Sequence, residues 1–159
     1  MARTNSRISF TIHRSGWLVI AVFFAFAFRD LGFANGVLGG VLFVVSLLIH
    51  ELGHATAAAL FDVPVYRIGL KFVGAYTHRK HASRPIHDVI ITASGPLASL
   101  FMTIVSIFVP RVGIWLATWN FGIVALNLIP LPGTDGYRIL KTLLFPDAAI
   151  YRRKIPDVA

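Results

Sequence analysis

Long apolar runs separated by short polar segments make up most of this chain. Four of them predict membrane-crossing helices, over residues of about 14–30, 36–61, 88–109 and 112–131. A helix needs about 20 residues to cross the hydrocarbon core of a bilayer. The last three runs reach that length unaided, whereas the strictly apolar part of the first, residues 16–28, needs its flanking residues.

A different period marks the segment between the second and third runs. Apolar side chains alternate with basic residues and glycine over residues 66–72, a period of two that is typical of a β-strand. Gly74 can turn the chain back through residues 75–80 as a hairpin, and residues 7–13 alternate as well and can pair with its edge. The predicted fold class is therefore an all-α polytopic membrane bundle of about four helices, with a small β-hairpin or sheet on the cytoplasmic side.

The composition also favours a membrane protein. Hydrophobic residues make up 56% and charged residues only 14% of the 159 residues, whereas about a quarter of an average soluble domain is charged. So few charges do not cover the surface of a soluble domain of this length, and we expect a single membrane-embedded domain over residues 1–159. The chain has no cysteine, which excludes disulfides and thiolate metal sites.

The basic residues predict the topology. With four spans, the loops on one side hold only Arg29 and Arg111. The flanks on the other side hold the rest, namely Arg3, Arg7, Arg14, Arg67, Lys71, Arg79, Lys80, Arg84, Arg138, Lys141, Arg152, Arg153 and Lys154. The positive-inside rule then predicts an integral protein of the cell (inner) membrane with both termini in the cytoplasm. This explains the net charge of +8 by contact with the lipid bilayer, without nucleic acid as a partner. Residues 1–16 are too polar for a cleavable signal peptide.

Small residues in the second and third runs predict close helix packing. Gly36 and Gly40 have the GxxxG spacing, and Gly53, Gly95 and Ser99 follow further along. Small side chains let helix backbones approach each other closely in lipid.

The second run contains the sequence HELGH at residues 50–54. His50 and His54 are four residues apart and share one helix face, so both can bind one ion. Catalytic zinc usually takes three protein ligands and a water molecule. Glu51, the only glutamate in the chain, is offset around the helix and can act as a general base towards that water. Such short motifs also arise by chance, but ionisable groups inside a membrane are costly and usually functional.

The third ligand must come from elsewhere in the chain. A second glutamate does not exist, and the third histidine of the extended motif would fall at Leu60. The remaining candidates are Asp30, Asp62, Asp88, Asp135, Asp147 and Asp157. The first is expected on the far side of the membrane and the last two in the polar tail. For Asp62 and Asp88, which flank helices at the surface, capping a helix or turn is the favoured role.

Asp135 is the favoured third ligand. It follows the fourth run in NLIPLPGTDG, residues 127–136, where two prolines and two glycines interrupt the helix. Broken backbone at membrane depth is tolerated only where it is buried in protein or lines a wet cavity. The alternative role of a simple turn residue is weaker, because Asp135 is expected at the same depth as the HELGH histidines.

These motifs resemble those of the site-2 protease family of intramembrane zinc metalloproteases. HELGH in one span, N-x-x-P-x-x-x-x-D-G in a later one and the SGP element of Ser94–Pro96 between them carry the resemblance. The family implies one Zn²⁺ per chain with His50, His54 and Asp135 as ligands, and Glu51 as the catalytic base.

The resemblance also implies a position for Asn127 near the metal, where it helps to hold the substrate backbone or to polarise its carbonyl. It implies a core of three helices with cytoplasm-side strands, one of which can pair with an unwound substrate. Many family members carry a PDZ or nucleotide-sensing domain, and no stretch of this chain is long enough to encode one. We therefore expect a minimal form.

The expected function is hydrolysis of a peptide bond within or near the transmembrane segment of a membrane protein substrate. One alternative is a metal-binding membrane transporter, which would need further intramembrane carboxylates or histidines as relay points. Another is a non-catalytic zinc scaffold, although structural zinc usually has four protein ligands. His78 and His81 suggest a second metal site, but Arg79 and Lys80 between them favour a basic loop at the lipid headgroups.

Overall fold

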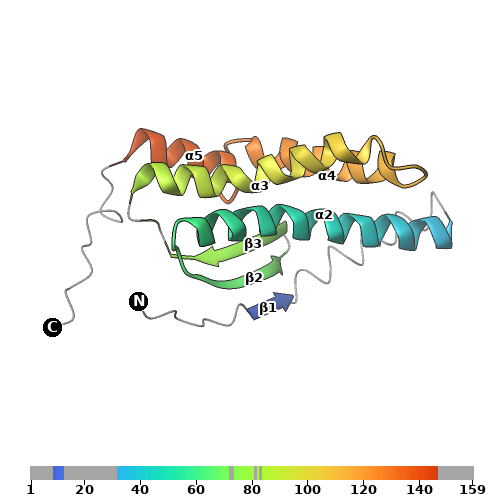
Figure 1. The fold of residues 1–159 in the computed structure, drawn as a ribbon, viewed down its shortest axis with the longest axis horizontal. Coiled ribbons are helices and arrows are strands. Elements are labelled where there is room, and N and C mark those ends of the chain that lie inside the picture. Colours follow the sequence, from blue (N-terminus) through green and yellow to red (C-terminus); the bar gives the residue numbers. More distant parts are fainter. Residues whose placement is uncertain (1–8, 13–31, 72–73, 81, 83, 147–159) are drawn as a thin grey trace.

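A computed structural model of the chain describes residues 9–12, 32–71, 74–80, 82 and 84–146 (Figure 1). In chain order its elements are β1 (Ser9–Ile12), α2 (Phe33–Leu60), β2 (Val65–Lys71), β3 (Gly74–Arg79), α3 (Pro85–Ser106), α4 (Gly113–Leu128) and α5 (Asp135–Leu144). The first predicted span, residues 14–30, lies outside the described residues, as do Asp147 and Asp157.

Three helices lie where the second, third and fourth spans are predicted, and their ends differ from the predicted ones by no more than three residues. α2 has 28 residues and α3 has 22, and both are long and apolar enough to cross a membrane. α4 has only 16 residues and ends before the predicted boundary at residue 131. Its C-terminal neighbour Ile129 is extended, because a residue that precedes proline is disfavoured in the helical region.

α5 is a helix that the sequence analysis did not assign. Its start is stabilised by Thr134, whose hydroxyl accepts a hydrogen bond from the Tyr137 N–H (3.3 Å) and donates one to the Ile129 carbonyl (2.6 Å). A threonine at the N-cap, followed by an acidic residue in the first turn, is a recognisable start signal. The prolines and glycines of the preceding segment instead predict an interruption of the fourth helix.

Figure 1 shows α2 lying between the sheet on one side and α3 and α4 on the other, and α2 contacts all of these elements. The sheet and α5 lie at the same end of the helices, the end at which α2 finishes and α3 begins. The carboxyl-terminal half of α2 is therefore enclosed by the other elements.

The three strands form one sheet in the order β1-β2-β3. β2 and β3 are antiparallel, with Leu70 opposite Ala75, and occupy the region where alternation indicates a hairpin. β1 pairs with β2 in parallel, with Ser9 opposite Arg67. β1 therefore covers the far edge of β2, while β3 is the edge strand nearest α2 (Figure 1).

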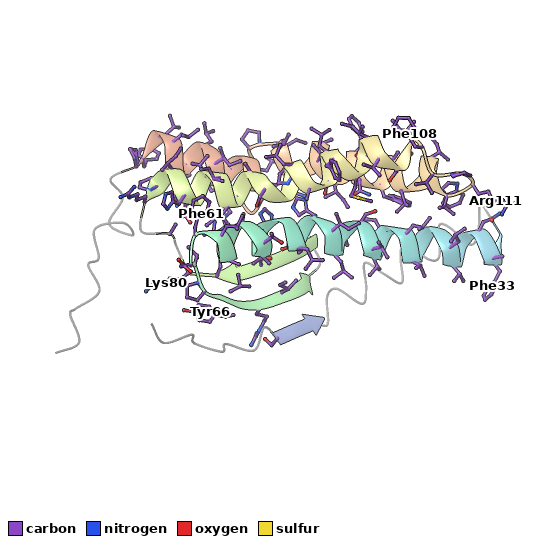
Figure 2. The ribbon with its side chains drawn as sticks, viewed as in Figure 1. Phe33, Phe61, Tyr66, Lys80, Phe108 and Arg111 are labelled. Atoms are coloured by element: carbon purple, nitrogen blue, oxygen red, sulfur yellow. The ribbon has the colours of Figure 1, made fainter. Side chains whose placement is uncertain are left out.

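Small and polar side chains make up much of the helix interfaces, beside a few apolar ones such as Ile91, and most large apolar side chains point outward. Ser46, Ser99, Ser106 and Asn120 are fully buried, at 0% exposure. Large apolar side chains of α2, α3 and α4 are exposed instead, and Figure 2 shows Phe33 and Phe108 at the end remote from the sheet. Water would not favour this distribution, whereas a bilayer does, because lipid tails are as apolar as the side chains.

One buried polar contact joins α2 to α4. The Asn120 amide donates a hydrogen bond to the Ser46 hydroxyl (2.9 Å) and another to the Leu116 carbonyl of its own helix (2.9 Å). The Ser46 hydroxyl in turn donates to the Leu42 carbonyl (2.9 Å).

We expect Ser46→Ala to lower the free energy of unfolding by about 1 kcal/mol, because it removes the acceptor of a buried amide between two helices. Unfolding in lipid bicelles measures this value. Thr118→Ala is the matched control, because the Thr118 hydroxyl is exposed and, in the part of the chain that the structure describes, bonds only to Ile114 of its own helix. Equal effects of the two substitutions would contradict the prediction.

Candidate metal centre

The last turns of α2 carry both histidines and the glutamate of HELGH into the interior. His50, Glu51 and His54 are 3%, 2% and 6% exposed, respectively. The two imidazole rings lie edge to face, with their centroids 4.9 Å apart. His50 and His54, four residues apart, therefore share one face of α2, as the motif predicts.

Asp135 is the first residue of α5 and is also buried, at 6% exposure. The segment after α4 turns sharply at Gly133, whose φ of 103° lies in the region that favours glycine. At Gly136, a Cβ atom would overlap the Leu128 carbonyl at the end of α4. These glycines let α5 start close against α4, and this start directs Asp135 towards α2.

The three side chains converge on one point. Asp135 Oδ2 lies 3.1 Å from His50 Nε2 and 3.1 Å from His54 Nε2, and the two Nε2 atoms are 3.2 Å apart. A tetrahedral site with metal–ligand distances of about 2.0 Å has ligand atoms about 3.3 Å apart. This nearly equilateral triangle therefore fits the ligand set of a zinc ion, and among the described residues it is the one such group of three.

Hydrogen bonds on the other side of each ring orient the imidazoles. His54 Nδ1–H donates to the Ile91 carbonyl (2.8 Å), and His50 Nδ1 lies 3.2 Å from the Ser99 hydroxyl. Both partners belong to α3. An Nδ1–H donor leaves the lone pair on Nε2, which is the atom of each ring that faces the triangle. The sequence analysis assigned Ser99 only to packing and did not identify Ile91.

The surroundings of Asp135 favour its charged form. Burial alone would raise the pKa of this carboxyl, but its hydrogen bonds with His50 and His54 outweigh burial and hold the pKa well below its usual range. The site thus combines two imidazoles with one carboxylate, a donor set that suits Zn²⁺.

Two glycines make room for the site between α2 and α3. A Cβ atom on Gly95 would overlap the imidazole of His54, and one on Gly53 would crowd the Ser94 carbonyl and Ala98. The Ser94 hydroxyl also donates to the Gly53 carbonyl (2.9 Å). The glycine of the SGP element therefore has a specific structural role, which is to leave space for the His54 ring.

Glu51 has a partner that sequence reasoning missed. The hydroxyl of Thr77, on β3, donates to Glu51 Oε2 at 2.5 Å. Asn127 is half-buried, and its amide donates to the Ile123 carbonyl one turn earlier in α4 (3.0 Å). The role of Asn127 near a metal stays a prediction.

The remaining candidates serve other purposes. Asp62 is exposed just after α2 and has a positive φ of 53°, the conformation of a turn residue. Asp88 does not take the N-cap position of α3, which is Arg84. It pairs instead with Arg79 and accepts a hydrogen bond from the Ala82 N–H (3.0 Å). His81 lies outside the described residues, so the second-metal alternative stays untested.

Comparisons with known proteins agree with this geometry. The sequence model of peptidase family M50 matches residues 39–114. Stage IV sporulation protein FB of Bacillus subtilis is 26% identical over 139 residues, which are 81% of this chain and 45% of that protein. The putative zinc metalloprotease Rip3 of Mycobacterium tuberculosis is 31% identical over 121 residues, 67% of this chain and 31% of that protein. The chain thus spans less than half the length of these relatives.

A solved structure with a similar fold is that of the site-2 protease from Methanocaldococcus jannaschii. Its TM-score is 0.76 at 25% sequence identity, and the match covers 93% of this chain and 72% of that one. Together with the family match, this similarity shows that the chain belongs to the site-2 protease family. It is therefore an integral membrane protein, and the metal that its family implies is Zn²⁺.

We expect Gly95→Ala to reduce zinc binding at least about tenfold, because the new methyl group displaces the His54 ring from its bond with Ile91. Metal content after dialysis against a zinc buffer measures the effect. Gly122→Ala is the matched control, since a Cβ there meets no atom of another described element within 4 Å. Full zinc occupancy in a folded Gly95→Ala protein would contradict this reading of the site.

Proposed function

We propose that this chain is an intramembrane zinc metalloprotease that hydrolyses a peptide bond within or near the transmembrane segment of a membrane protein. The observation that carries the proposal is the triangle of ligand atoms, 3.1–3.2 Å on each side, with the Glu51 carboxylate buried beside it. The protease names of the relatives support the same activity, whereas nothing in them favours a transporter or a non-catalytic scaffold.

In this proposal, His50, His54 and Asp135 hold one Zn²⁺ per chain. When bound, the ion would acidify a water molecule and polarise the scissile carbonyl. Glu51 accepts a proton from the attacking water as its oxygen bonds to the carbonyl carbon. It then donates that proton to the leaving amine as the C–N bond breaks. Asn127 is proposed to hold the substrate backbone near the reacting carbonyl.

The substrate must present an extended segment, because the carbonyls of a helix are shielded and already hydrogen-bonded. β3 is suited to receive it, since it has no second strand neighbour within the described part of the chain. The Lys80 N–H donates towards β2, to the Pro64 carbonyl (3.1 Å). Because N–H groups alternate along a strand, those of Ala75 and Thr77 point to the free edge, where a substrate strand can add.

The proposed topology has four spans and places the sheet, the metal centre and both termini on the cytoplasmic side. The exposed basic residues Arg67 and Lys80 belong to the sheet end of the molecule, whereas Arg111 lies at the opposite end (Figure 2). Water and substrate would then reach the site from the cytoplasmic surface. The whole of residues 1–159 acts as one catalytic unit in this arrangement.

Glu51→Gln tests the reaction directly. We expect proteolysis to fall roughly 10²- to 10⁴-fold, because the amide cannot accept a proton, while zinc stays bound at one ion per chain. The assay uses purified protein in proteoliposomes with single-span test peptides whose helices contain Asn and Gly, which ease unwinding. A zinc chelator should also stop cleavage by the wild type. Zinc uptake into the vesicles, or cleavage unaffected by Glu51→Gln, would refute the proposal.

Ala75→Pro tests the binding of substrate at β3. Proline removes one N–H from the free edge without removing a bond to β2, so we expect KM to rise about fivefold, the effect of losing roughly 1 kcal/mol from one hydrogen bond. Ala75→Val keeps the N–H and is the control. An unchanged KM in a zinc-loaded Ala75→Pro protein would exclude this edge as the docking site.

A further inference from the structure

The hydrogen bond between β3 and Glu51 connects the sheet to the reaction centre. Thr77 Oγ1 donates to Glu51 Oε2 at 2.5 Å, although the two residues are 26 positions apart. Glu51 is 2% exposed. Among the residues that the structure describes, hydrogen bonds to Glu51 involve only Oε2. The second oxygen, Oε1, therefore has no such partner there and is available to a water molecule.

The end of β3 that carries Thr77 is held firmly in place. Thr77 and Arg79 are two residues apart and so point to the same face of the strand. The Arg79 guanidinium pairs with Asp88 and donates to the Thr92 hydroxyl (3.1 Å), both on α3. The Arg79 and Asp88 side chains are 2% and 4% exposed. Separating the two partners of a buried ion pair leaves each charge uncompensated. The Arg79–Asp88 pair therefore resists displacement of this end of β3.

α3 therefore contacts the elements and side chains that position the proposed catalytic groups. It supplies the Ile91 carbonyl and the Ser99 hydroxyl to the two histidine rings. Through Asp88 it also holds the strand whose hydroxyl contacts Glu51. The glutamate and the metal ligands are thus positioned relative to one helix, even though Glu51 itself belongs to another.

A general base needs such control, because a glutamate side chain has three rotatable bonds and proton transfer requires hydrogen-bond distance to the reacting water. A bond to one carboxylate oxygen restricts these rotations and leaves the other oxygen free to accept the proton. Threonine suits this task, since its branched Cβ restricts its own side-chain rotamers.

We propose that Thr77 is a positioning residue for the general base, which holds the Glu51 carboxylate so that its second oxygen faces the water attacking the substrate. This inference rests on the proposed proteolytic function. This positioning role differs from a purely structural role, in which Thr77 would only join the sheet to α2. Loss of a structural link would affect stability or substrate binding rather than turnover.

The test compares Thr77→Val, which keeps the shape but removes the hydroxyl, with Thr77→Ser, which keeps the hydroxyl. We expect Thr77→Val to lower kcat about 10- to 100-fold, with KM and zinc content unchanged. Thr77→Ser should restore kcat to within about threefold of the wild type. Thr118→Val is the matched control, because the Thr118 hydroxyl is exposed and its one partner among the described residues is the Ile114 carbonyl of its own helix.

A double substitution provides an independent measurement. If Thr77 acts through Glu51 alone, Thr77→Val should not lower the residual activity of Glu51→Gln any further. A further loss there would overturn the proposal, as would an unchanged kcat in Thr77→Val, a loss confined to KM or zinc content, or no rescue by Thr77→Ser. If Thr77→Val does not fold, Thr77→Ala takes its place against the same serine control.

The outcome distinguishes this inference from the proposed function. A zinc-loaded wild type that cleaves none of the single-span test peptides refutes both. An active wild type that depends on Glu51 but is indifferent to the Thr77 hydroxyl refutes only the role of Thr77.

Discussion

The rest of this structure depends on one constraint. Two imidazole nitrogens and one carboxylate oxygen must lie within 3.1–3.2 Å of one another. Buried polar and charged groups are costly unless each has a partner. Here the negative charge of Asp135 lies against two rings, and each ring is bonded behind to α3. The helices can satisfy these requirements only by approaching closely, and Gly53, Gly95 and Gly136 occupy the points of contact.

The same need for close approach explains why many of the buried side chains are small or polar, while most large apolar side chains of the helices are exposed. Lipid gives apolar side chains little reason to turn inward, so small residues and hydroxyls take a large share of the helix interfaces beside a few apolar side chains such as Ile91. Ser46, Ser99 and Asn120 are fully buried, and each bonds across to a neighbouring helix. The Ser99 contact also orients a histidine ring, so helix packing and the candidate metal centre share part of their contacts.

Local patterns in the sequence predicted a large part of this structure. The helices in three of the four predicted spans, the strand alternation and the HELGH face all depend on spacings within a single element, and such spacings can be read directly from the sequence. Asp135 could be singled out because the prolines and glycines of residues 127–136 interrupt the helix of the fourth apolar run at the expected depth of the HELGH histidines. The length of α4 was overestimated, since the effect of Pro130 on Ile129 is stronger than the apolar run suggests.

Contacts between elements far apart in the sequence could not be predicted, because they do not depend on spacings within a single element. The Thr77–Glu51 bond depends on how β3 folds back over α2, and nothing near Thr77 in sequence signals an acid partner. The role of Gly95 depends on the position of a ring from another helix. α5 has a start signal at Thr134 but is short and amphipathic, so it lacks the long apolar run by which the other helices were found.

The parallel pairing of β1 with β2 has a further consequence for specificity. Among the described residues the open sheet has two edge strands, β1 and β3, and because β1 pairs on the far side of β2, only the β3 edge lies next to α2 and the candidate metal centre (Figure 1). On the proposed function, an extended segment that paired with β1 would lie two strands away from the metal centre, and only a segment paired with β3 would be close enough to be cleaved. Selection among membrane proteins would then depend less on recognising side chains than on how readily a candidate helix gives up its own backbone bonds.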